Sequence, residues 1–143
     1  MWGNIDQIAL RFRALDKKLQ NFVEKGSNYN GNEMNNAPHW IHNAEIWYKP
    51  SFLKGFRIGA EWQKVGSYYM DPKNTVKYQG YNVLNLRTGY QHNGFEVWMN
   101  VMNATDNYYS YISTKSTSYS YQLAEPRNFV VGISYDLARL VKN

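Results

Sequence analysis

The sequence contains no cysteine among its 143 residues. Disulfides and thiolate metal sites are therefore excluded as sources of stability or chemistry. The chain also has no apolar run that approaches the roughly 20 residues of a membrane-spanning helix. Its length is that of one ordinary domain, which leaves little room for two separate functional domains.

Basic residues outnumber acidic ones, but they do not cluster. The formal net charge is +5. The Lys and Arg residues are scattered, with no basic run and no helix that carries a basic stripe. Nucleic acid is therefore not expected as a partner.

Five segments alternate apolar and polar residues with period two, as a strand does when its two faces meet different surroundings. In the second segment, Phe56, Ile58 and Trp62 alternate with Arg57 and Glu61. The mean hydropathy of −0.65 hides this pattern, because the two faces average out. Each segment is near the roughly 9–11 residues that a tilted strand needs to cross a bilayer. The predicted strands are 39–49, 55–65, 81–91, 94–102 and 127–137.

The region before residue 39 fits two interpretations. Leu10 and Phe12 alternate with Arg11 and Arg13, which favours a further strand. The alternative is an amphipathic helix over residues 14–24, where apolar residues also recur on one side.

The connections between the predicted strands alternate in length. Residues 50–54 and 91–94 are short, and the second ends in Asn93-Gly94, a strong hairpin signal. Residues 25–38, 66–80 and 103–126 are long and polar. Membrane barrels show this arrangement, with short periplasmic turns and longer extracellular loops. The predicted fold class is all-β, an antiparallel transmembrane β-barrel segment.

Aromatic residues make up 17% of the chain and gather toward the ends of the predicted strands. Membrane barrels place aromatic girdles at both interfaces, whereas soluble β-domains also enrich aromatics in strands. The residues concerned are Trp40, Trp47, Tyr48, Trp62, Tyr81, Tyr90, Phe95, Phe129 and Tyr135.

Short motifs occur in a fixed order along the chain. They are Gly31-Asn32 followed by Pro38, Tyr48-Lys49-Pro50, the loop pattern from Tyr69 through Asp71 to Asn74-Thr75, the segment 97–109 with Asn103, Asp106 and Tyr109, and Pro126-Arg127. In order and spacing, residues 31–137 resemble the C-terminal part of the TonB-dependent receptors.

The resemblance implies that residues 1–143 form the last five or six strands of a 22-stranded barrel, without the plug domain. It implies a place in the bacterial outer membrane, with the long connections outside and the chain end on the periplasmic side. The implied partners are outer-membrane lipid, the remaining barrel and plug, the TonB complex through an N-terminal part, and a small-molecule nutrient.

Both ends of the chain depart from a complete protein of that family. Met1-Trp2-Gly3 lacks the features of a signal peptide, so the chain is expected to be a piece of a longer exported protein. Leu137 stands where the family commonly ends on Phe, which predicts inefficient insertion or an altered reading frame in the tail that follows.

No constellation of catalytic residues is present, so the protein is not expected to be an enzyme. His39 and His42 are three apart within a predicted strand and would point to opposite faces, so neither a metal site nor a cofactor is expected. Asp71 and Asn74 offer oxygen ligands for calcium, but Asp-Pro-Lys-Asn is first of all a turn signal.

Tyrosines in the long connections are the ligand-binding candidates. Tyrosine offers a large, rigid contact area at low entropic cost. The alternative is that these rings pack the loops together. The candidates are Tyr68, Tyr69, Tyr108, Tyr109, Tyr111, Tyr119 and Tyr121, with Tyr78 beside the first two.

The predicted function is that of a fragment of an outer-membrane receptor for TonB-energised uptake of a scarce nutrient, such as an iron-siderophore or similar metal chelate. One alternative is a subunit of a small oligomeric outer-membrane pore or adhesin. The other is a soluble secreted β-domain that binds sugar or protein.

Overall fold

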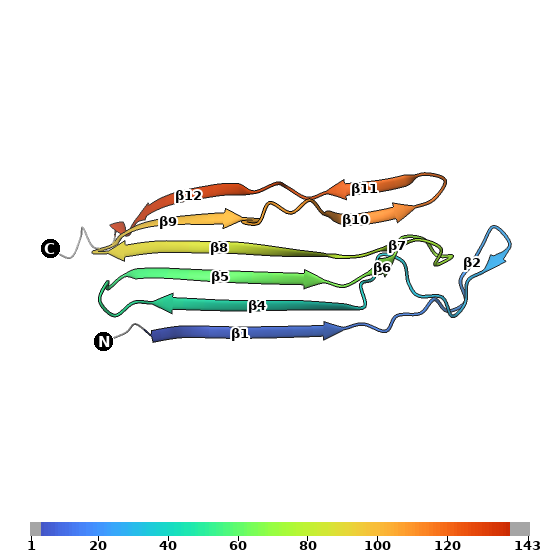
Figure 1. The fold of residues 1–143 in the computed structure, drawn as a ribbon, viewed down its shortest axis with the longest axis horizontal. Helices are drawn as coiled ribbons and strands as arrows, with labels where there is room; N and C mark the ends of the chain where they lie inside the picture. The colour runs from blue at the N-terminus through green and yellow to red at the C-terminus, as the bar shows by residue number, and fades with distance from the viewer. Residues whose placement is uncertain (1–3, 138–143) are drawn as a thin grey trace.

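Six long strands form one antiparallel meander in the computed structural model, which describes residues 4–137 (Figure 1). The sheet order is β1-β4-β5-β8-β9-β12, so each strand lies beside its neighbour in the chain. Residues 138–143, for which an altered reading frame was predicted, lie outside the described residues. The strands are β1 (Asn4–Ala14), β4 (Trp40–Lys49), β5 (Phe56–Val65), β8 (Tyr81–His92), β9 (Phe95–Met102) and β12 (Asn128–Tyr135).

These bounds confirm the five strands predicted from the alternation, each within two residues. The strand interpretation of the N-terminal region is confirmed by β1, in which Leu10 pairs with Ala44 and Phe12 with His42. The helix alternative for residues 14–24 is wrong. There the backbone pairs with residues 29–34, since Leu19 N–H donates to Asn32 O and Met34 N–H donates to Lys17 O. Within residues 4–137, no helix is long and apolar enough to cross a membrane.

One face of the sheet is apolar. Residues directly opposite each other in paired strands share a face. One such row crosses the sheet from Ile46 through Ala60, Leu86 and Val101 to Phe129. Further apolar side chains of this face remain uncovered, and Leu10 and Ile133 are 77% and 70% exposed.

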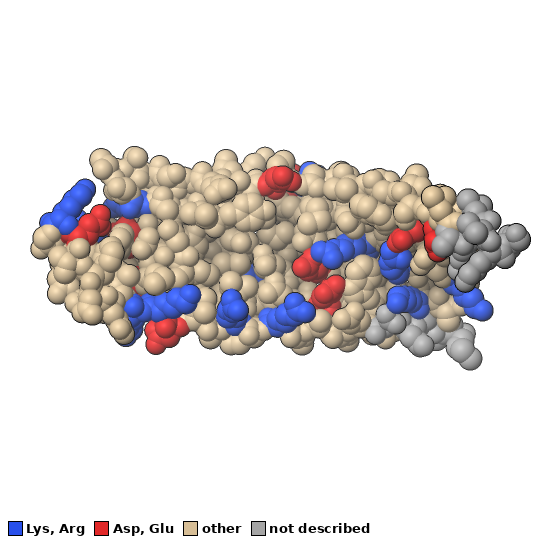
Figure 2. All heavy atoms as spheres, turned by 180° about the vertical axis from the view of Figure 1, so that it is seen from behind, with Lys and Arg blue, Asp and Glu red and all other residues tan. Residues whose placement is uncertain are grey.

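The other face is polar and charged, and it is the face seen in Figure 2. Arg57 pairs with Glu96, and Arg87 Nη2 lies 2.6 Å from Glu61 Oε2. Two tryptophans, Trp47 and Trp98, also lie on this face. Trp47 donates its indole N–H to Glu45 Oε1 at 2.6 Å and covers Gly59, where a Cβ would approach the ring to 2.7 Å. Trp47, which was predicted only to lie toward a strand end, therefore packs on the polar face.

The buried core lies at one end of the sheet. Among residues 4–137, the buried apolar side chains are those of Val65, Tyr68, Met70 and Val83. They gather where β5 and β8 meet the second long connection. The fold is therefore an open sheet with two exposed faces and a packed cap at one end.

Candidate functional site

Three long connections leave the sheet at the end opposite both termini (Figure 1). We call residues 15–39 the first loop, 66–80 the second loop and 103–127 the third loop. Each contains a small hairpin that the sequence did not predict. The first holds β2 (Val23–Glu24) and β3 (Ser27–Asn28), the second β6 (Tyr68–Tyr69) and β7 (Lys77–Tyr78), and the third β10 (Ser110–Lys115) and β11 (Tyr119–Leu123).

A tight turn organises the second loop. The Asp71 carboxylate accepts hydrogen bonds from the N–H groups of Thr75 and Val76, both at 3.0 Å, and from the Thr75 hydroxyl at 2.8 Å. Burial opposes the charge, but these donors outweigh it and hold the pKa of Asp71 below its usual value. The carboxylate is thus occupied by the turn, which favours the turn interpretation over calcium.

The second loop binds the third loop through two tyrosine hydroxyls. Tyr68 accepts a hydrogen bond from Ser113 N–H at 3.0 Å, and Tyr78 accepts one from Ser110 N–H at 2.9 Å. The backbones also meet, because Lys115 N–H donates to Met70 O. Ser113 is fully buried as a result.

The second loop also binds the first loop, through Asn74. This residue adopts a positive φ of 57°, which asparagine tolerates better than most residues. Its side chain accepts from Glu33 N–H at 2.7 Å and donates to Glu33 O at 2.9 Å. Asn32 Nδ2 adds a bond to Pro72 O at 2.8 Å. The three loops therefore form one hydrogen-bonded unit.

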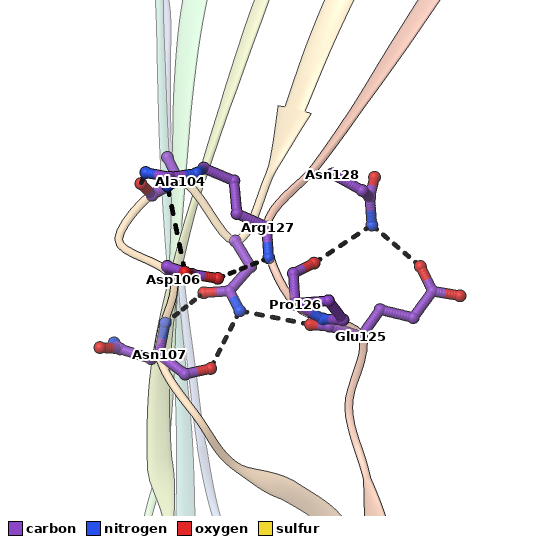
Figure 3. Close-up of polar contacts among 8 residues, drawn as sticks. Ala104, Asp106, Asn107, Glu125, Pro126, Arg127 and Asn128 are labelled. Carbon is purple, nitrogen blue, oxygen red and sulfur yellow. Dashed lines mark hydrogen bonds and ion pairs between the residues drawn. The ribbon is translucent and has the colours of Figure 1, made fainter.

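Polar contacts of Asn107, Glu125 and Arg127 close the base of the third loop (Figure 3), and Asn103 lies at their centre. Its side chain accepts from Asn107 N–H and donates to Asn107 O, at 3.0 and 2.9 Å, and donates to Glu125 O at 3.3 Å. Nearby, Asp106 Oδ1 accepts from Arg127 N–H at 2.8 Å. The two ends of the loop, 22 residues apart, are thus fastened together at the sheet.

The candidate tyrosines fall into different environments. Tyr68 is 3% exposed and packs the loops, whereas Tyr108 is 93% exposed. Tyr109 stacks on Tyr81 with ring centroids 4.3 Å apart, and Tyr111 meets Tyr109 edge-on at 5.3 Å. Burial and the neighbouring Tyr111 hydroxyl raise the pKa of Tyr109 well above its usual value, so its hydroxyl stays protonated.

The remaining candidates lie on loop hairpins. Tyr69 is half-buried, with the Lys77 ammonium 5.0 Å from its ring centroid. Tyr119 and Tyr121 are exposed on β11 and lie parallel, with centroids 6.3 Å apart. The structure thus gathers Tyr109 and Tyr111, and separately Tyr119 and Tyr121, into two aromatic pairs.

Metal ligands are not grouped in the part of the chain that the structure describes. There, no cluster of three or more His, Asp or Glu side chains could hold a metal ion. His39 Nε2 lies 2.9 Å from Glu33 Oε2, while His42 packs between the rings of Phe12 and Trp40.

Asn74 and Asn103 were not predicted as the residues that fasten the loops. Their signal was weak, because an asparagine beside a turn indicates only a local bend. Glu33, the partner of Asn74 in the first loop, lies 41 residues away in the chain, which no local pattern reveals. The strand interpretation for residues 94–102 did place Asn103 at a strand end.

Known proteins share both the sequence pattern and the fold. Residues 2–104 match the model of a family described as TonB dependent receptor-like, beta-barrel. The siderophore receptor PiuA from Acinetobacter baumannii is 22% identical, with a TM-score of 0.76 over 93% of this chain. BauA, the ferric preacinetobactin receptor of the same species, is 20% identical, with a TM-score of 0.71 over 92% of this chain. The match covers 20% of each of those two proteins.

Proposed function

Because the chain belongs to the TonB-dependent receptor-like β-barrel family, we propose that it forms part of the wall and three outer loops of an outer-membrane receptor. This receptor takes up an iron-siderophore or similar metal chelate with energy delivered by TonB. The plug and the TonB-contacting segment belong to other parts of such a receptor.

The observation that carries the proposal is the uncovered apolar face of the sheet. Large apolar side chains remain exposed along β1 and β12, and Phe12 and Phe129 are 65% and 64% exposed. In water this arrangement would be costly, at about 25 cal/mol for each Å² of apolar surface left exposed. Facing lipid, it is the expected outer surface of a barrel strand.

The opposite face supports the same orientation. Its ion pairs, Arg57 with Glu96 and Arg87 with Glu61, suit a polar lumen. The loops are also built as a unit, and tyrosines occupy their exposed surface. This is the region where a ligand arriving from outside would first contact the protein.

Uptake measurements test this function. The gene that encodes this chain, with its natural flanking sequence, would be expressed in a strain lacking its own receptors and supplied with ⁵⁵Fe-loaded siderophores. We expect uptake that disappears in a strain without TonB and in a variant whose residues 107–124 are replaced by a short glycine-serine link. Residues 1–143 alone are expected to give no uptake. Uptake that persists without TonB would contradict the proposal.

A further inference from the structure

Residues of the three loops line a partly open polar cavity, and none of the seven candidate tyrosines is among them. Its volume is 620 Å³, within the range of roughly 300–1,000 Å³ typical of small-molecule sites. Each loop contributes one ammonium group to the wall: Lys25 from the first loop, Lys73 from the second and Lys115 from the third.

The positive charge of this cavity is not cancelled by its acidic groups. Of the two carboxylates in the wall, Asp71 is 5% exposed and already accepts the three hydrogen bonds of its turn. These hydrogen bonds stabilise the charge of Asp71 and do not remove it. Formally, Asp71 and the exposed Glu24 offset two of the three lysines, which leaves one net positive charge. Across residues 4–137, neither Lys25 nor Lys73 takes part in an ion pair.

Hydroxyl groups complete the donor set. Thr114, Ser116 and Thr117 line the cavity together with the lysines. Thr75 also lines it, but its hydroxyl hydrogen is donated to Asp71. Lys115 Nζ lies 3.4 Å from Thr75 Oγ1 and 5.8 Å from the ring centroid of Tyr119, which holds this ammonium at the cavity wall. Ammonium and hydroxyl donors that converge from several directions suit a ligand with several anionic oxygens.

We infer that this cavity binds a small oxyanion that carries two or more carboxylate or phosphate groups. The inference rests on the proposed function in one respect: the three loops must face the outside, where such a ligand would arrive. It adds the chemical class of the ligand and moves the recognition from the tyrosines to Lys25, Lys73 and Lys115.

Calorimetric titration of the purified protein that carries this chain, in a nonionic detergent and at physiological ionic strength, tests the inference. The probes are inorganic pyrophosphate and citrate. Lys25→Gln and Lys73→Gln are each expected to weaken binding roughly three- to tenfold, because each removes one full charge from the ligand's surroundings. Glu24→Gln is expected to strengthen it.

Lys77→Gln is the matched control. Like Lys73→Gln, it removes one positive charge from the second loop, but Lys77 lies over the Tyr69 ring and not in the cavity wall. Affinity for both probes should stay within about twofold. No saturable binding by the unaltered protein would overturn the inference, as would equal losses in Lys77→Gln and Lys73→Gln. This titration does not measure uptake. A failure of the inferred anion site can therefore be told apart from a failure of the proposed function.

Nanodiscs distinguish a soluble anion from a lipid headgroup as the natural source of these oxygens. Phosphatidylcholine discs would be compared with discs that also contain phosphatidylglycerol. If lipid headgroups occupy the cavity, the anionic discs lower the affinity for pyrophosphate in the unaltered protein but not in the Lys25→Gln, Lys73→Gln double variant. If the ligand is soluble, both discs give the same affinity. Weaker pyrophosphate binding in the anionic discs for both proteins alike would contradict a site at these lysines.

Discussion

The phenolic oxygen of Tyr68 accepts a hydrogen bond from the backbone N–H of Ser113, at a donor–acceptor distance of 3.0 Å. The two residues are 45 positions apart and lie on different loops. Both are buried, so water does not compete for the bond. This contact makes the second loop the support on which the third loop rests.

Tyr68→Phe is therefore expected to loosen the third loop. The change leaves a buried N–H without an acceptor, at a cost of about 1–3 kcal/mol. Hydrogen exchange at Ser113 should quicken at least fivefold, with little change in β8 or β9. Tyr69→Phe is the control, because within residues 4–137 the Tyr69 hydroxyl forms no hydrogen bond. Equal exchange in the two variants would show that the Tyr68 contact does not hold the loop.

Acid should open the second loop through Asp71. The pKa of this carboxyl is lower in the folded loop than in the unfolded chain, where it is near 3.8. The folded form therefore binds fewer protons, and the stability that the carboxylate contributes is fully present above about pH 4. It is lost as the pH falls through the lower folded pKa. Hydrogen exchange at Thr75 and Val76, corrected for the intrinsic pH dependence, measures this loss.

Asp71→Asn should lower the protection of Thr75 and Val76 already at pH 7, because an amide is a weaker acceptor than a carboxylate. It should also remove most of the acid-induced change. Asp16→Asn, at an exposed position of the first loop, is the matched control and should leave both properties intact. An acid transition that is the same in Asp71→Asn and in the unaltered chain would exclude Asp71 as its origin.

Removing the Asn103 side chain should free the base of the third loop. Asn103 is 3% exposed, so Asn103→Ala strands Asn107 N–H and Glu125 O and also places alanine at a φ of 49°. We expect rapid cleavage between residues 107 and 125 by a nonspecific protease. Asn103→Asp keeps the acceptor for Asn107 N–H and tolerates this φ, so its cleavage should be intermediate. If alanine and aspartate behave alike, the accepted hydrogen bond does not matter.

Gly132 should not tolerate a side chain, because Trp98 covers it on the polar face of the sheet. A Cβ at this position would overlap the indole ring. Gly132→Ala is expected to destabilise the barrel by about 1–3 kcal/mol, measured as a lower unfolding temperature in detergent. Ser134→Ala, on the same face of β12, is the control. The penalty of Gly132→Ala should shrink in a Trp98→Leu background, and an unchanged penalty there would place its cause elsewhere.

The long strands could be predicted because their alternation repeats over eight or more residues. The apolar row through Ile46, Leu86 and Phe129 is the structural result of that pattern. The loop hairpins could not be predicted, because β2, β3, β6 and β7 have two residues each and offer no period to detect.

The burial and the contacts of each aromatic residue could not be predicted from the sequence either. Trp47 packs on Gly59 because the register of β4 and β5 places the two directly opposite each other. Tyr68 is buried because the third loop folds back over it, and Tyr108 is exposed although it lies in an equally tyrosine-rich segment. Burial in these loops depends on contacts between distant parts of the chain, which composition and local spacing do not encode.

In the proposed membrane arrangement, lipid covers the apolar face, with the loops on one side of the membrane and the short turns on the other. Residues 1–143 contain no cysteine, so a single introduced cysteine reports its own surroundings once the unaltered protein shows no labelling. Three positions are suited to this test. Tyr108 is 93% exposed on the third loop, Phe52 is 79% exposed in a short turn, and Ile133 is 70% exposed on the apolar face.

Labelling with a charged, membrane-impermeant maleimide tests this claim most directly. Tyr108→Cys should react on intact cells, and Phe52→Cys only after the outer membrane is permeabilised. Ile133→Cys should stay unreacted in both conditions until the protein is unfolded, because its thiol would lie in lipid. If Ile133→Cys reacts as fast as Tyr108→Cys, or if Phe52→Cys reacts on intact cells, the proposed membrane arrangement is wrong.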